Sequence, residues 1–156
     1  MSKKPSEPRL AISNRCERLR FRDREVTVFF HALTATGLCS LKGELSVVFL
    51  SDAEMAELHG RFLNDPSPTD VITFPSQAKD DFAGEICVSA ETAWRESRRR
   101  GIPLSREMCL YLAHGWLHLA GYDDVSEDDR LAMREAEKEV LEAVEIAVAL
   151  PEFTFS

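Results

Sequence analysis

Two histidines one helical turn apart are the residues of this sequence best suited to chemistry. His114 and His118 are four positions apart, and on a helix this spacing leaves about 40° of rotation and about 6 Å of rise between two side chains. Both imidazoles can therefore face one point, as in the His-x-x-x-His helices of zinc hydrolases. Asp124 follows after Gly121, which lets the chain leave the helix, so its carboxylate can fold back as an oxygen ligand.

Three protein ligands are typical of a catalytic zinc site, because the fourth tetrahedral position stays open. The sequence accordingly predicts one Zn²⁺ per chain, held by His114, His118 and Asp124. The alternative is structural: both rings would be core histidines bonded to carbonyl oxygens, and Asp124 would help to cap the next helix. A zinc peptidase is disfavoured, since position 115 is Gly where those enzymes place the glutamate that activates water.

The elements that would position these residues follow from hydrophobic spacing and helix caps. A helix from residue 104 or 105 to Gly121 would carry both histidines, and apolar residues three or four apart indicate its buried face. Another helix is expected to begin at Ser126, whose acidic successors suit the positive end of a helix, and to run towards Leu150. Earlier helical patterns cover residues 23–36, 51–62 and 89–100.

Apolar and β-branched runs predict the strands. They are an edge strand at 10–12, a strand covered on both faces at 44–50, and two neighbouring, hairpin-like strands at 71–74 and 84–89. The order of elements predicts a single α+β domain, with a mixed sheet of about four strands and about five helices. The polar residues 1–8 are expected to form a disordered tail before a domain that spans 9–156.

The composition is that of a globular protein. The chain has 156 residues, 44% hydrophobic and 29% charged, with a net charge of −8, which excludes fibrous and disordered classes. No apolar run is long enough to span a bilayer or to act as a signal peptide, so no membrane association and a cytoplasmic location are expected. The four cysteines include no Cys-x-x-Cys pair, which disfavours a thiolate zinc site.

The stretch around the histidines resembles the signature of a known family. Residues 114–123, HGWLHLAGYD, are similar to the HGxLHLxGYDH motif of the YbeY endoribonucleases, which are bacterial ribosomal RNA maturation factors. Residues 68–75, PTDVITFP, are similar to that family's PTDVLSFP, and residues 84–89, GEICVS, to its GDIxIS strand. The order and spacing also agree, and the resemblance covers roughly residues 44–145.

The resemblance implies a single-domain α+β fold and a zinc ion held in a cleft, with metal-dependent cleavage of single-stranded RNA. It further implies a role in 16S rRNA 3′-end maturation and ribosome quality control. The partners would be single-stranded rRNA and the small ribosomal subunit, and we expect a monomer. The base that assists water on the zinc is unassigned: Asp70 and Asp123 are candidates, although Asp123 can instead accept a hydrogen bond from a ligand imidazole.

Two positions depart from the family pattern. The family's third ligand is usually His, whereas this chain has Asp124; carboxylate is an accepted zinc ligand, but its charge makes water on the ion less acidic. The family also usually carries an Arg after an aromatic residue in the loop before Pro-Thr-Asp, and here Leu63 follows Phe62. A phosphate-contacting cation is thus missing, which predicts either weak nuclease activity or a cation from elsewhere.

Nearby arginines are the candidates for that RNA-binding cation: Arg61, Arg95, Arg98, Arg99 and Arg100. Their structural interpretation is that Arg61 is a solvated helix charge and that the others complement the negative end of a helix. The glutamate-rich last helix, which includes Glu137, is expected to face away from RNA.

The sequence leaves two main functions open. The first is a zinc-dependent endoribonuclease. The second is a nonenzymatic ribosome-assembly factor, in which the same metal only fastens the end of a helix to the following turn. A zinc hydrolase with another substrate is a third hypothesis.

Overall fold

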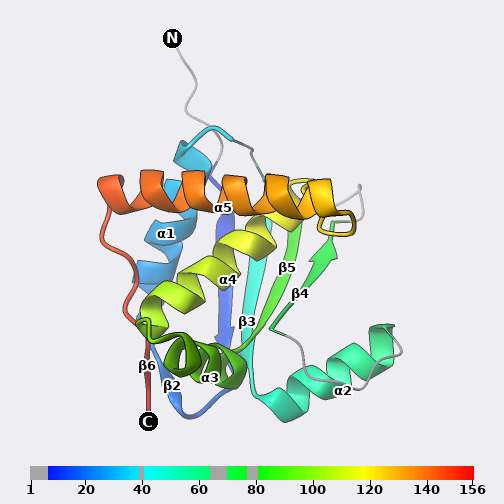
Figure 1. The fold of residues 1–156 in the computed structure, drawn as a ribbon, viewed down its shortest axis with the longest axis vertical. Helices are drawn as coiled ribbons and strands as arrows, with labels where there is room; N and C mark the ends of the chain where they lie inside the picture. Colours follow the sequence, from blue (N-terminus) through cyan, green and yellow to red (C-terminus); the bar gives the residue numbers. More distant parts are fainter. Residues whose placement is uncertain (1–6, 39–40, 64–69, 77–80) are drawn as a thin grey trace.

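A computed structural model describes residues 7–38, 41–63, 70–76 and 81–156 of the chain. In this part the chain forms five helices, a four-stranded sheet and a two-stranded sheet (Figure 1). The elements are β1 (Arg9–Asn14), β2 (Leu19–Arg20), α1 (Asp23–Ala35), β3 (Glu44–Leu50), α2 (Asp52–Leu63), β4 (Val71–Pro75), β5 (Phe82–Ser89), α3 (Ala90–Arg100), α4 (Leu104–Leu119), α5 (Glu127–Ala147) and β6 (Thr154–Phe155). The predicted α+β class, five helices and four-stranded mixed sheet are confirmed.

The four-stranded sheet has the order β1-β3-β5-β4. β3 pairs in parallel with both β1 and β5, while β4 is antiparallel to β5. The edge strand predicted at 10–12 is β1, and the neighbouring pair predicted at 71–74 and 84–89 is β4 with β5. The tail predicted at 1–8 lies mostly outside the described residues; of its last residues, Pro8 is buried and its carbonyl oxygen is 3.2 Å from Nε2 of His31.

Side chains of the central strands alternate between two faces of the sheet. Val47 and Ile86 point into the large core, which the sheet shares with α1, α3, α4 and α5. Leu50 and Cys87 point to the other face, where Met55 of α2 covers them. In Figure 1, α4 and α5 cross the sheet, and α2 stands apart from both of them.

The α4 helix approaches β5 closely because two glycines lie at the contact. A Cβ atom on Gly115 would lie 2.7 Å from Cγ2 of Ile86, and one on Gly84 would lie 2.7 Å from Cδ2 of Leu119. Gly84 also has a φ of +133°, a conformation that other residues rarely adopt. These contacts fix the distance of α4 from the sheet, and therefore the place of any side chain that α4 presents.

The sequence predicts some element boundaries correctly and misses others. Ser126 and Asp129 form a capping box at the start of α5, as the predicted start requires, and α5 ends at Ala147 rather than near Leu150. The strands β2 and β6 were not predicted, since two residues are too few to show a periodicity. No helix among the described residues is both long and apolar enough to cross a lipid bilayer.

Candidate metal centre

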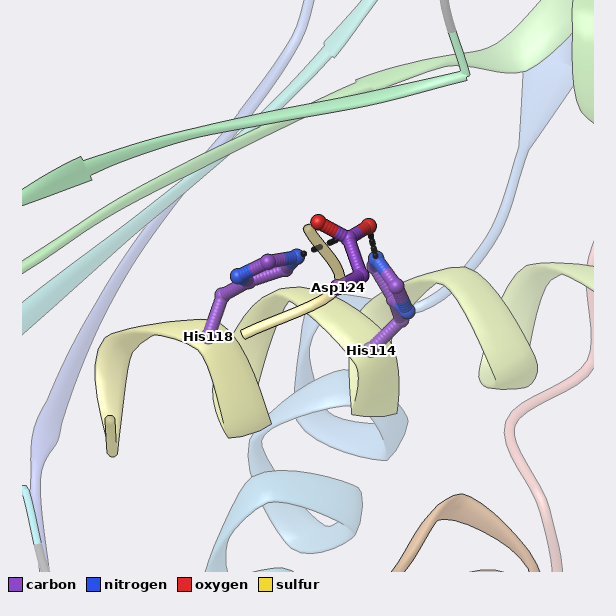
Figure 2. A group of neighbouring side chains, drawn as sticks. All are labelled: His114, His118 and Asp124. Carbon is purple, nitrogen blue, oxygen red and sulfur yellow. Dashed lines mark ion pairs between the residues drawn. The ribbon is translucent and has the colours of Figure 1, made fainter. Parts of the chain in front are cut away.

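The imidazoles of His114 and His118 and the carboxylate of Asp124 converge on one point (Figure 2). Both histidines project from one face of α4, with ring centroids 4.6 Å apart. Oδ2 of Asp124 lies 3.7 Å from Nε2 of His114 and 3.4 Å from Nε2 of His118. One potential ligand atom from each residue lies within 4.8 Å of the other two. The structure therefore brings together the three residues that the sequence suggested as ligands.

The spacing of these atoms fits a divalent metal ion. In a tetrahedral site with bonds of about 2.0–2.2 Å, as zinc makes to nitrogen and oxygen, ligand atoms are about 3.3–3.6 Å apart. The 3.4 Å separation between Oδ2 of Asp124 and Nε2 of His118 falls in this range, and the 3.7 Å separation to Nε2 of His114 lies just above it. Two imidazole nitrogens and one carboxylate oxygen are also a common donor set for zinc and related ions.

The turn after α4 brings Asp124 back to the histidines. Gly121 has a φ of +110°, and the backbone N–H of Tyr122 donates to the carbonyl oxygen of Leu117 at 3.0 Å, which closes the end of the helix. The carboxylate of Asp123 accepts the backbone N–H of Asp124 at 2.8 Å. Asp124 is thus held in a short connection between two capped helices.

Glu137 of α5 holds the other side of the His114 ring. Its Oε1 lies 2.7 Å from Nδ1 of His114, and its side chain is only 12% exposed. An ionised carboxylate only accepts hydrogen bonds, so Nδ1–H of His114 donates and Nε2 presents its lone pair to the site. Burial lowers the pKa of His114, but the hydrogen bond to Glu137 and the negative charges of Glu137, Asp124 and Asp70 raise it above its ordinary value.

The last helix is expected to face away from RNA, but its Glu137 lies against His114 and lines the cleft beside it. This residue lies within the apolar stripe of α5, beside the buried Met133, Ala136 and Val140. A carboxylate at a stripe position is a signal that the sequence offered, because such a group needs a partner inside the protein. The role considered for Asp123, accepting a hydrogen bond from a ligand imidazole, belongs to Glu137 in this structure.

A cleft of about 600 Å³ opens beside His114. Its walls come from α3, from α4, from the start of β4 and from Glu137. Of the two candidate bases, Asp70 lines this cleft together with His114, whereas Asp123 lines a separate hollow beside Tyr122. The loop at 64–69, with the first residues of the Pro-Thr-Asp motif, lies outside the described residues.

The predicted RNA-binding arginines separate into two groups. Arg95, Arg99 and Arg100 line the cleft, but the guanidinium of Arg98 lies over the ring of Trp94, 5.2 Å from its centroid. Arg61 is exposed in the last turn of α2, on the opposite face of the sheet from α4. The structure thus places only part of the predicted set near His114.

Arg100 is fixed in the wall of the cleft by a buried carboxylate. Its Nη1 lies 2.8 Å and 3.1 Å from the two oxygens of Glu107, whose side chain is 1% exposed. Burial raises the pKa of Glu107, and the positive charge of Arg100 opposes that rise.

Comparisons with known proteins agree with this geometry. A family model described as "Endoribonuclease YbeY" matches residues 11–145. A curated protein of that name from Protochlamydia amoebophila is 40% identical over 98 residues, which are 60% of this chain and 65% of the relative. Another, from Methylocella silvestris, is 34% identical over 119 residues, 74% of this chain and 68% of the relative.

A solved structure shows the same fold. The solution structure of TM1509 from Thermotoga maritima superposes with a TM-score of 0.62 at 26% identity, and the match covers 86% of this chain and 88% of that one. The alignments to the two curated relatives span about two thirds of each relative's length. The family match spans nearly all of the four-stranded sheet, the candidate metal centre and most of α5, so the chain belongs to the family of the YbeY endoribonucleases.

Proposed function

We propose that this protein is a zinc-dependent endoribonuclease that cuts single-stranded RNA during maturation of the 3′ end of 16S rRNA. The observation that carries this proposal is the convergence of His114, His118 and Asp124, of which His114 also lines a cleft, in a chain of the YbeY family. The resemblance of this chain to the YbeY family also supports a cytoplasmic monomer that acts on the small ribosomal subunit.

Each residue of the centre has a role in this reaction. Zinc would supply a Lewis acid for a phosphodiester oxygen and for the attacking water. His114, His118 and Asp124 would hold the ion, and Glu137 fixes the tautomer and orientation of His114.

Asp70 is the better placed of the two candidate bases, since it lines the cleft with His114. An anionic ligand such as Asp124 would make water on a bound zinc ion less acidic than a third histidine would. A proton acceptor on the protein therefore carries more of the activation than in a site with three histidines. Replacing Asp70 by Asn should lower kcat while zinc affinity stays unchanged; unchanged kcat would remove Asp70 from this role.

The experiment that tests the function compares two histidine substitutions. Zinc content is measured by mass spectrometry after purification without chelators, and cleavage of a labelled single-stranded RNA is then followed for the wild type and for His114→Ala. His31→Ala is the matched control, because His31 contacts Glu7 and Pro8 rather than the candidate centre. We expect stoichiometric zinc and cleavage in the wild type and the control, and neither in His114→Ala.

The other outcomes decide between the remaining hypotheses. If the zinc-loaded wild type leaves RNA intact while His114→Ala loses thermal stability, the metal is structural and the nonenzymatic assembly factor is supported. A wild type that purifies with no metal contradicts both functions.

A further inference from the structure

We propose that Tyr111 and Arg99 form a subsite for a backbone phosphate of the RNA, next to the candidate metal centre. RNA as the ligand rests on the function proposed above. The subsite itself rests on the side chains that line the cleft on α3 and α4.

Tyr111 offers a hydroxyl that no described residue of the protein binds. Its side chain lines the cleft although the residue is only 7% exposed. It precedes His114 by three residues on the same face of α4, which is about 4.5 Å along the helix axis. Within the described part of the chain, the hydroxyl makes no hydrogen bond. Among the described residues, the buried side-chain nitrogen and oxygen atoms without a partner do not include this hydroxyl, so solvent reaches it from the cleft. A ligand in the cleft can therefore accept a hydrogen bond from it.

The phenol is a hydrogen-bond donor at neutral pH. Burial raises the pKa of Tyr111, and the negative charges of Glu107, Asp70 and Glu96 raise it further. The hydroxyl therefore keeps its proton and can donate it to an anionic oxygen without adding charge to the cleft.

Arg99 faces the cleft from α3. Its Nε donates to Oε2 of Glu96 at 2.9 Å, and Nη2 bonds the same oxygen. This pair holds one edge of the guanidinium and leaves Nη1 for a ligand, in the described part of the structure. The side chain is 70% exposed, so a strand of RNA can reach it. Arg100 is less suited, since its Nη1 is bound to the buried Glu107.

A phosphodiester fits this pair of donors. A phosphodiester carries one negative charge and only accepts hydrogen bonds. Arg99 of α3 would supply a positive charge, and Tyr111 of α4 would supply a neutral hydrogen-bond donor. The subsite also supplies a cation that the chain lacks at Leu63, where the family usually has Arg. A strand bound there would place a neighbouring phosphate at the metal centre.

Contacts at short range, rather than a broad positive field, would hold the strand. The cleft is lined by Arg95, Arg99 and Arg100, but also by the carboxylates of Asp70, Glu96, Glu107 and Glu137. These charges nearly cancel, so removing a single contact should have a clear effect on affinity.

Binding of a fluorescent 2′-O-methyl oligoribonucleotide to the zinc-loaded protein tests the subsite. This probe has the phosphates of RNA and resists cleavage, and its affinity is measured by anisotropy over a range of salt. We expect Tyr111→Phe to weaken binding about three- to tenfold, the range for loss of one hydrogen bond. Its melting temperature should not change, because the hydroxyl has no partner in the described protein.

Arg99→Gln should weaken binding about tenfold and reduce the magnitude of the slope of log affinity against log salt by about 0.7, as expected for one lost phosphate contact on a single strand. Arg106→Gln is the matched control, since Arg106 is also an exposed arginine paired with a glutamate, Glu145, but lies outside the cleft. We expect less than a twofold effect from it. Equal loss in Arg99→Gln and Arg106→Gln, or wild-type affinity in Tyr111→Phe, overturns the proposal.

The same samples separate this inference from the proposed function. A wild type that binds no RNA refutes RNA as the ligand, and with it the proposed function. A wild type that binds RNA with the expected pattern of variants, but does not cleave it, supports the subsite while the catalytic function fails.

Discussion

Replacing Glu137 by Gln should weaken zinc binding about tenfold. The 2.7 Å bond from His114 ends on a carboxylate that is 12% exposed, and hydrogen bonds to charged groups contribute about 1.5–3 kcal/mol. An amide oxygen keeps the shape of the acceptor but retains about half of that strength. The loss is about 0.7–1.5 kcal/mol, or about three- to twelvefold in affinity at 1.4 kcal/mol per factor of ten.

Competition with a chromogenic chelator measures this affinity directly. Glu139→Gln is the control, because it makes the same chemical change two residues away on an exposed position of α5. The melting temperature of the metal-free protein shows whether either variant is damaged before zinc is added. If Glu137→Gln binds zinc as tightly as Glu139→Gln, Glu137 does not orient His114 and the argument from the hydrogen bond is refuted.

Two further predictions concern the scaffold. Gly115→Ala should lower the free energy of unfolding, measured with urea, by about 1–3 kcal/mol, because the new Cβ would lie 2.7 Å from Cγ2 of the buried Ile86. The loss should be smaller in an Ile86→Ala background, and an equal loss in both backgrounds contradicts this explanation. Asp52→Asn should lower the free energy of unfolding by about 1–2 kcal/mol at pH 7, because the hydrogen bonds to a charged acceptor are weakened. Burial raises the pKa of Asp52, but hydrogen bonds from Arg95, Ser89 and Thr92 lower it below 3.8 overall. A carboxyl with a lowered pKa stabilises the fold above its unfolded pKa and loses that effect as the pH falls through its folded pKa, so the wild type and Asp52→Asn should converge in acid; a difference that stays constant with pH refutes the assignment.

The part of the site that is local in sequence could be predicted from the sequence. His114 and His118 belong to one helix, and Asp124 follows in the next turn, so their approach depends only on helix geometry and a short connection. Glu137 comes from another helix, and its contact depends on how α5 packs on α4. The apolar stripe around Glu137 indicates that this residue faces inward. It does not indicate that the residue meets the imidazole of His114.

Neighbouring arginines show a similar limit. Arg98 and Arg99 were both predicted to bind RNA from their position in the sequence, although consecutive residues on a helix point about 100° apart. The buried Ala93 and Ser97 define the inner face of α3; Arg98 then lies on the flank with Trp94, and Arg99 on the flank that faces the cleft. The pairing of β2 with β6 joins Leu19 to Phe155, and no local pattern could have indicated it.

The three candidate ligands lie close together in the sequence, within residues 114–124. Folding of the chain therefore need not wait for binding of a metal ion. The side chains of these ligands are 23% to 45% exposed and come from one helix and the turn after it, so the scaffold does not depend on an ion to close a distant contact. We therefore expect the newly made chain to reach its final shape first and to acquire its ion afterwards. The metal supply of the surroundings would then decide how many finished molecules are competent at any moment.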